Sequence, residues 1–458
     1  MRGLMLTCVL AGCFSPAPQA GAPCADNRDC PSGLECTPDN RCERPGTYVP
    51  PDACAALTCE GDNLVGCGMV TTCPYGCDSI APHCLRLAPS NGVTVGLLDG
   101  VTADVTQADL DLDTDDGTIS STNAAGDTTV IRPAGTGVIA GIRFEVVDGN
   151  GVFAAHSWTI SSADDWDGAG NPPLVLFAAT TITVSSALDV GGTGTSGGPG
   201  ATNANNSTTA GGCRGRAGRS NSGIGAAFGE GGGGGGGAMA GGDGAASNQA
   251  NPTGQGGSSC TTSPSTIPLR GGSGGGHGGQ DIDNGGGGGG GAVMLVAMES
   301  VTVSGAVTAP GAGGRSATTG AGGGGGGGSG GAILIEAPMV SISGQLTTNG
   351  GGGGAPAGGN DGTRGSVTSA SPAAGGTFSC VPSPGATPVT RRGGAGAAGM
   401  ATPADGTTCT VMDAAMVVTS SQGGGGGGAV GRIEVRRAVG GITGLASPAA
   451  LLTNAVFE

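Results

Sequence analysis

The stretch that decides the fold is residues 292–307, which read AVMLVAMESVTVSGAV. Residues 293–297 form a short continuous apolar run, and apolar residues alternate with small or polar ones in 301–307. Alternation with a period of two is typical of a strand that buries one face. We therefore expect two strands, with these side chains pointing inward: Val293, Leu295, Ala297, Val301, Val303 and Val307.

The same pattern recurs along the chain. Residues 174–188 (LVLFAATTITVSSAL) match it without a gap, and residues 333–346 (ILIEAPMVSISGQL) match it with one residue missing between the two runs. A one-residue slip inverts the facing of a continuous strand, so the deletion predicts a turn at that point. A fourth copy at 430–435 stops early and runs into Arg436-Arg437, as a terminal capping rung would.

Two short strands per repeat, a turn and a small residue at the corner predict a mainly β protein with a right-handed parallel β-helix, or solenoid. A single rung cannot bury its hydrophobic face, whereas stacked rungs bury a continuous one. The repeat template is similar to the repeats of filamentous haemagglutinin-type adhesins. That resemblance implies a β-helical rod with an adhesin-like role.

Five glycine tracts lie between the repeats, at 231–237, 285–291, 322–328, 350–354 and 423–428. Three of them, 285–291, 322–328 and 423–428, are followed by an apolar run. We interpret them as long insertions between rungs. Without side chains, extended polyproline-II-like tracts could pack side by side and hydrogen-bond each other. The entropy cost of fixing glycine favours the alternative, mobile loops that are held only at their ends.

The charge of the chain is unevenly distributed. Of the 34 carboxylates, 23 lie in residues 1–190 beside 7 Arg, whereas residues 191–458 hold 11 of each and are neutral; no Lys is present. Recognition of nucleic acid needs a basic footprint, so this function class is excluded. Short β-branched runs separated by turns predict an acidic β segment at 88–170, ahead of a glycine-rich repeat domain at 172–446.

The N-terminus is typical of an export signal. Arg2 is followed by a short apolar run and by Leu10-Ala11-Gly12-Cys13, which resembles a bacterial lipobox. The resemblance implies a lipoprotein signal peptide at 1–12, a lipid on the Cys13 thiol and a tether at 13–23. Phe14 after the lipidated residue favours the outer membrane or the cell surface by the same analogy. The alternative is an ordinary cleaved signal peptide or a chance match.

Cysteines after the signal fall into even groups, as a disulfide framework in an oxidising compartment requires. A four-Cys module spans 24–44 and a six-Cys module spans 54–84, and both are too poor in apolar residues to bury a core. These modules resemble Cys-rich segments of bacterial surface lipoproteins and short EGF-like or dickkopf-like modules, which implies a stalk; a binding module is the alternative. The disulfide candidates are Cys24, Cys30, Cys36, Cys42, Cys54, Cys59, Cys67, Cys73, Cys77, Cys84, and the pairs Cys213–Cys260 and Cys380–Cys409, each of which falls within one insertion.

Metal sites are poorly supported by the sequence. Structural zinc sites use closer Cys pairs than any found here. Acidic residues in 109–116 are weak calcium candidates (Asp111, Asp113 and Asp115), because an EF-hand loop starting at Asp111 would need Gly and Glu where Asp116 and Thr122 stand. We expect no metal and no cofactor.

Two function classes remain. The first is a non-enzymatic surface lipoprotein, structural or adhesin-like, that displays a glycine-rich β-helix on a disulfide-linked stalk. The alternative is a β-helix protein that acts on or binds polysaccharide, because this fold also hosts such enzymes. Sugar platforms need aromatic residues, and only Phe228 and Phe378 lie between residues 178 and 456. We therefore expect no enzyme, with the membrane and extracellular polysaccharide or cell-surface components as partners.

Overall fold

The computed structural model describes residues 23–25, 30–37, 40–45, 57–66, 69–123, 125–161, 165–208, 212–223, 226–246, 254–260, 263–279, 285–318, 322–414 and 418–458. The chain divides into two compact units, Met1–Arg86 and Leu87–Glu458. Both are mainly β, and no α-helix occurs among these residues. Within the same residues, no helix is long and apolar enough to cross a membrane.

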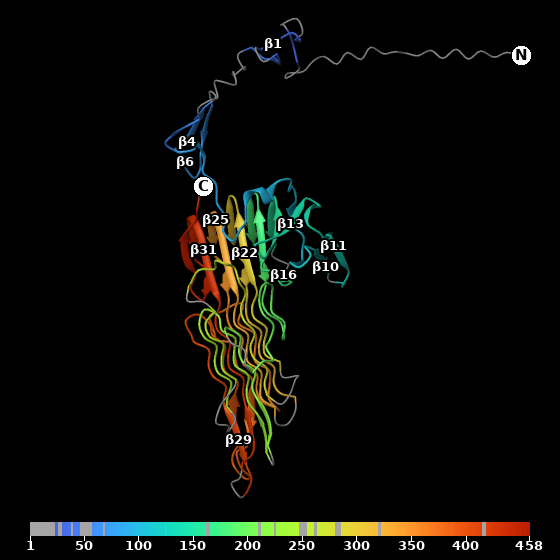
Figure 1. The fold of residues 1–458 in the computed structure, drawn as a ribbon, viewed down its shortest axis with the longest axis vertical. Helices are drawn as coiled ribbons and strands as arrows, with labels where there is room; N and C mark the ends of the chain where they lie inside the picture. Colours follow the sequence, from blue (N-terminus) through green and yellow to red (C-terminus); the bar gives the residue numbers. More distant parts are fainter. Residues whose placement is uncertain are drawn as a thin grey trace, which may run out of the picture. The chain divides into compact units, whose positions relative to one another are not determined.

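The first unit consists of short antiparallel strands fastened by disulfides (Figure 1). Its disulfides are Cys24–Cys36, Cys30–Cys42, Cys59–Cys77 and Cys73–Cys84. Crosslinks replace the hydrophobic core that such small segments lack. The strands are β1 (Glu35–Cys36), β2 (Cys42–Glu43), β3 (Thr58–Glu60), β4 (Asn63–Gly66), β5 (Met69–Thr72), β6 (Cys77–Asp78) and β7 (His83–Cys84).

The second unit contains two large sheets that curl as a half-barrel around one core. The twelve-stranded sheet holds β8 (Asp104–Val105), β12 (Gly137–Ile139), β13 (Ile142–Val147), β14 (Asn150–Ala155), β15 (Ser157–Ile160), β17 (Leu174–Ala178), β18 (Thr181–Val184), β22 (Ala292–Ala297), β23 (Ser300–Val303), β25 (Ala332–Ile342), β31 (Arg432–Ile442) and β33 (Leu451–Asn454). The eight-stranded sheet holds β9 (Leu110–Asp113), β10 (Ile119–Thr122), β11 (Thr128–Arg132), β16 (Asp165–Ala169), β19 (Ala187–Asp189), β24 (Ala306–Thr308), β26 (Gln345–Thr347) and β32 (Leu445–Ser447).

Successive repeats pair in parallel and in register. Leu174 aligns with Val293, Val293 with Ile333, and Ile333 with Ile433. The inward-pointing residues predicted from the sequence all lie in the buried core. The outer face of β14, β17, β22 and the first half of β25 (332–336) is also buried, beneath residues 87–98, which include the 3-10 helix η2 (Val95–Leu98), and beneath a segment at 263–269 that we call the strap.

The predictions for the third and fourth repeats are wrong. β25 is a single eleven-residue strand across the deletion, so no turn forms there. The facing changes within the strand instead, because Ile335 and Ala337 point into the core, followed by Val340 and Ile342. The fourth repeat does not stop at Arg436-Arg437, since β31 continues to Ile442 and β32 completes the rung.

The glycine tracts form an ordered bundle that continues from the strands (Figure 1). In tract 322–328, Gly324 donates its N–H to Gly423 O, Gly325 to Arg315 O and Gly326 to Gly276 O, at 2.8–2.9 Å. Gly327 then returns to the first neighbour, because it donates to Gly426 O. A three-residue period of outward hydrogen bonds is expected of polyproline-II-like strands, which have three residues per turn and no internal hydrogen bonds.

Tract 322–328 lies at the centre of this bundle. It accepts hydrogen bonds from tracts 231–237, 285–291 and 350–354, and it donates to tract 423–428. A Cβ atom added at Gly326 would lie closer than 3.0 Å to the backbone of Gly233. Only glycine permits this packing. The favoured expectation of mobile loops is therefore wrong for the described tracts, since hydrogen bonds to neighbouring backbones compensate for the entropy of fixing them.

Two small sheets adjoin the glycine bundle, one mixed and one antiparallel. One has four strands, in the order β20 (Ser220–Gly223), β21 (Ala226–Gly229), β30 (Val418–Gly423) and β29 (Thr408–Met412); the other pairs β27 (Thr377–Cys380) with β28 (Val389–Arg392). A disulfide joins Cys380 to Cys409, which links the two sheets.

Candidate functional site

A row of hydroxyl side chains crosses the outer face of four neighbouring strands. Thr159, Thr183, Thr302 and Ser341 align in register on β15, β18, β23 and β25. The residues on either side of each of them point into the core, so these four point away from it. We call this row the hydroxyl face. It presents hydrogen-bonding groups at the spacing of neighbouring strands, about 4.8 Å.

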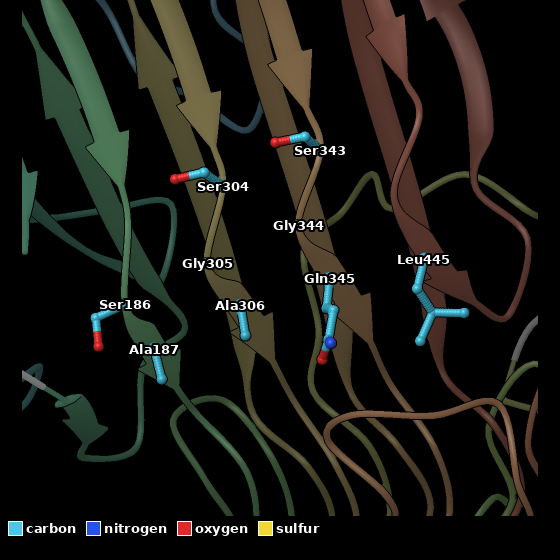
Figure 2. Close-up of a pocket in the computed structure, with 9 residues that line it drawn as sticks. All are labelled: Ser186, Ala187, Ser304, Gly305, Ala306, Ser343, Gly344, Gln345 and Leu445. Carbon is cyan, nitrogen blue, oxygen red and sulfur yellow. The ribbon is translucent and has the colours of Figure 1, made fainter. Parts of the chain in front are cut away.

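A groove runs beside the hydroxyl face, where each rung turns from one sheet to the other. Its volume is ≈ 470 Å³, and no ionisable side chain lines it. In Figure 2, Ser304 and Ser343 point to the same side from neighbouring rungs. The remaining lining residues are Ser186, Ala187, Gly305, Ala306, Gly344, Gln345 and Leu445.

Glycine at the turn keeps the groove regular. A Cβ atom at Gly305 would collide with Ser186 O, and one at Gly344 would collide with Gly305 O. Small corner residues, expected from the repeat pattern, therefore let the rungs approach each other closely at this point. The groove and the hydroxyl face together offer a neutral, polar, repetitive surface.

Two buried carboxylates share one guanidinium in the part of the sheet that residues 87–98 and the strap cover. Glu336 of β25 and Glu434 of β31 have side chains only 2% and 1% exposed, respectively. Arg436 lies 3.3 Å from Glu336 Oε1 through Nη1 and 2.9 Å from Glu434 Oε1 through Nε. Burial of charge is tolerated when it is paired and hydrogen-bonded; both carboxylates are paired with Arg436, although Glu336 Oε1 itself accepts no hydrogen bond.

Each carboxylate also holds a covering segment in place. Glu434 Oε2 accepts hydrogen bonds from the Thr266 N–H (2.7 Å), the Thr266 hydroxyl (3.0 Å) and the Ser265 hydroxyl (3.2 Å) of the strap. Glu336 Oε2 accepts one from the N–H of Ser90, 2.9 Å away. The cluster therefore fastens both segments that cover the outer face of the sheet.

Their environments shift the pKa values of the two carboxyl groups in opposite directions. Burial raises the pKa of Glu336, against the lowering effect of hydrogen bonds from Ser90 and of the Arg436 charge. Burial also acts to raise the pKa of Glu434, but hydrogen bonds from Thr266 and Arg436 outweigh it and the pKa is lowered. Split carboxyl pKa values are typical of acid–base pairs, but the strap and residues 87–98 cover this one.

A serine, a histidine and an aspartate meet at the edge of the sheet. His156 Nδ1 lies 2.7 Å from Asp104 Oδ1, and the Ser157 hydroxyl donates to the same oxygen at 2.5 Å. Hydrogen bonds from Ser157 and His156 lower the pKa of Asp104. Nucleophilic catalysis needs the hydroxyl bonded to the imidazole. Here the hydroxyl bonds to the carboxylate, which does not activate it.

The weak calcium candidates are not gathered into a site. The Asp113 carboxylate accepts the N–H of Asp115, and the Asp115 carboxylate accepts hydrogen bonds from Asn171. Asp111 is exposed on β9. These carboxylates stabilise a turn and its neighbour.

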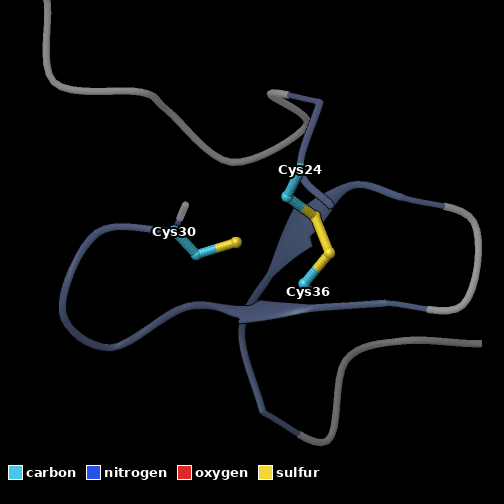
Figure 3. Close-up of side chains that lie close together, drawn as sticks. All are labelled: Cys24, Cys30 and Cys36. Carbon is cyan, nitrogen blue, oxygen red and sulfur yellow. A yellow bond between two sulfur atoms is a disulfide. The ribbon is translucent and has the colours of Figure 1, made fainter. Parts of the chain in front are cut away.

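Within the described ranges, one group of potential metal ligands lies close together: Cys24, Cys30 and Cys36 (Figure 3). The Cys24 and Cys36 sulfurs are bonded to each other, and that of Cys30 is bonded to Cys42. Metal binding requires the thiolate. The proximity therefore reflects the disulfide framework.

The other predicted cysteines divide between disulfides and free thiols. Cys380 and Cys409 are paired as predicted. Cys213 and Cys260 are free thiols, so their predicted disulfide is absent; the Cys260 thiol instead lies 3.1 Å from both Gly236 O and the Ser273 hydroxyl. Cys13, Cys54 and Cys67 lie outside the described residues. Multiple disulfides indicate an extracellular or exported protein.

Sequence reasoning missed the carboxylate cluster. Its signal was an acidic residue inside an otherwise apolar strand, at Glu336 and at Glu434. A charged residue is tolerated at such a position only if that face of the sheet is exposed to solvent or if a polar partner is buried beside it. Alternation alone cannot distinguish these cases, because the strap and Ser90 come from distant parts of the chain.

The comparisons with known proteins give no family for this chain. No family model matches it, and neither the curated proteins nor the solved structures that were searched contain a match.

Proposed function

We propose that this chain is a non-enzymatic surface lipoprotein, structural or adhesin-like, that displays a glycine-rich β-helical body on a disulfide-linked stalk. The observation that carries the proposal is the buried, hydrogen-bonded bundle of glycine tracts. Ordering glycine costs more backbone entropy than ordering any other residue. In such a bundle backbone packs directly against backbone, and the property that we assign to it is stiffness.

The β-helical part of the proposal is supported by the parallel rungs. Each repeat supplies one strand to the eight-stranded sheet and the rest to the twelve-stranded sheet, and successive repeats stack in register. Such stacking extends a single core through all the repeats. Display on a cell surface would use both the stiffness of the bundle and the regularity of the rungs.

A non-enzymatic role is supported by the contacts of two clusters whose residue types are common in active sites. Glu336 and Glu434 fasten covering segments, and the Ser157 hydroxyl is bonded to Asp104 rather than to His156. In both clusters the polar groups are used to hold the fold. The second candidate function, binding of polysaccharide, is favoured by the groove and the hydroxyl face (Figure 2).

The adhesin-like function predicts that the whole mature protein binds neutral glycans through the hydroxyl face. Thr302→Val removes a hydroxyl from the middle of that face with little change in volume, and we expect at least tenfold weaker binding on a glycan array. Thr390→Val, on the exposed hairpin strand β28, is the matched control and should bind like the wild type. Release of unsaturated uronate or reducing sugar from a bound glycan would contradict the non-enzymatic assignment. Equal binding by both variants would contradict the assigned face.

The lipoprotein assignment predicts that Cys13→Ser abolishes anchoring. The wild type should incorporate labelled palmitate, fractionate with membranes and be lost from intact cells treated with protease. The variant should be unlabelled, because it lacks the thiol that would accept the lipid. Cys380→Ser serves as a control for the general effect of losing a cysteine. A Cys13→Ser variant that still takes up label would disprove the anchor.

A further inference from the structure

Cys213 and Cys260 differ from the other described cysteines, which are all in disulfides. They belong to two segments of the glycine bundle that lie next to each other. Ser258 donates its N–H to Gly212 O (3.1 Å), and its hydroxyl donates to the same oxygen (3.0 Å). The two thiols therefore stand on adjoining backbones.

Both cysteines also contact the same glycine tract, 231–237. The N–H of Gly236 donates to Cys213 O (2.7 Å), and the N–H of Cys260 donates to Gly237 O (2.9 Å). The Cys260 thiol donates to Gly236 O at 3.1 Å. Gly236 is thus held from both sides by the two cysteines.

We propose that Cys213 and Cys260 are a redox-active thiol pair, in which disulfide exchange with a small external disulfide closes a crosslink beside tract 231–237. The two backbones adjoin each other and are fixed on a shared neighbour, tract 231–237. Closure therefore requires side-chain rotation rather than rearrangement of the bundle. The crosslink would lie beside the end of this tract, where the N–H of Ala238 donates to Val430 O (2.9 Å) just ahead of β31.

The chemistry of closure balances with one external disulfide. The Cys213 thiolate attacks one sulfur of that disulfide, a mixed disulfide forms, and the first small thiol leaves. The Cys260 sulfur then attacks Cys213 Sγ and displaces the second small thiol. Two electrons pass to the external disulfide, and the two protons of the protein thiols end on the two released thiols.

The order of attack follows from the surroundings of Cys260. Burial, and then the hydrogen bond with Cys213, raise the pKa of Cys260 to about 12. Its thiol therefore stays protonated in the resting state, so Cys213 reacts first. Cys260 completes the crosslink only when the adjacent sulfur has become an electrophile.

The test uses the full mature chain and oxidised glutathione, with peptide mapping under non-reducing conditions and titration of free thiols. Titratable thiols at Cys213 and Cys260 in the protein as isolated, and a crosslinked peptide that contains both after treatment, are the expected results, with no glutathione retained. The Cys380–Cys409 crosslink serves as the internal reference. Cys260→Ser should trap glutathione on Cys213, whereas Cys213→Ser should react at least tenfold more slowly.

Three results would overturn the proposal. Two thiols that remain titratable in the treated wild type would show that the pair does not close. Glutathione retained on both positions would show that the sulfurs cannot reach each other. A crosslink from Cys213 or Cys260 to any other cysteine would show a different disulfide framework.

Discussion

Replacing Gly326 with alanine is expected to destabilise the second unit by at least about 3 kcal/mol, or to prevent it from folding. The new methyl group would meet the carbonyl group of Gly233, closer than 3.0 Å. Gly326 also donates to Gly276 O and accepts from the N–H of Gly287. Overpacking a close-packed site typically costs 1–3 kcal/mol when side chains can move. Here the neighbours are backbone, which is itself held by further tracts, so the cost should lie at or above that range.

Thermal and chemical unfolding followed by circular dichroism measure this effect. Gly441→Ala is the matched control, because a Cβ atom there meets only Arg437 Nη2, at 3.9 Å. It should change the free energy of unfolding by less than about 1 kcal/mol. If Gly326→Ala unfolds at the same temperature as the control, the tracts cannot be packed as described.

Arg436→Met is expected to cost about 3–5 kcal/mol at neutral pH, the usual effect of removing one partner from a buried ion pair. It leaves Glu336 and Glu434 buried without their shared cation. Methionine keeps most of the volume of the arginine stem, so the loss reports on charge rather than on packing. Arg437→Met is the control, since Arg437 makes none of the ion pairs seen among the described residues.

The stability of the Arg436→Met variant should also depend on pH differently from that of the wild type. In the wild type the pKa of Glu434 is lowered, so its contribution to stability is present above the unfolded value of about 4.3 and is lost as the pH falls through the folded value. Without Arg436, burial should raise the pKa of both carboxyl groups. A raised carboxyl pKa favours the folded state at low pH, so the deficit against the wild type should shrink between pH 7 and pH 5. A deficit that is independent of pH would contradict the role given to Arg436.

The strand positions were predictable because alternation reports directly on burial. Val293, Leu295 and Ala297 point into the core as the pattern indicated. The turn expected in the third repeat was wrong, because Pro338 and Met339 absorb the change of facing within β25 while both ends stay paired. The rung beyond Arg436-Arg437 was missed because its apolar pattern is weak and its partners on β25 decide it.

The candidate sites were less predictable than the strands. The hydroxyl face follows from the repeats, since Thr183, Thr302 and Ser341 occupy equivalent positions. The carboxylate cluster does not, because Ser90, the strap and β31 are brought together only by folding. The sequence matched Cys213 with Cys260, and their backbones do adjoin, but spacing along the chain does not report the oxidation state of a pair, and both are thiols.

By itself the sequence determined that this is a mainly β, exported, disulfide-containing chain with stacked repeats, because alternation, cysteine number and turn residues act over a few neighbouring positions. Only the tertiary structure decided what the glycine tracts do. A glycine tract has no side chains to encode a partner, and the N–H groups of tract 322–328 find acceptors on several separate segments, some nearby (Ala312 and Arg315) and some far away in the chain (Gly276, Gly423 and Gly426). The register of the tracts comes from the rungs they enter, since Ala332 aligns with Ala292 on one side and with Arg432 on the other.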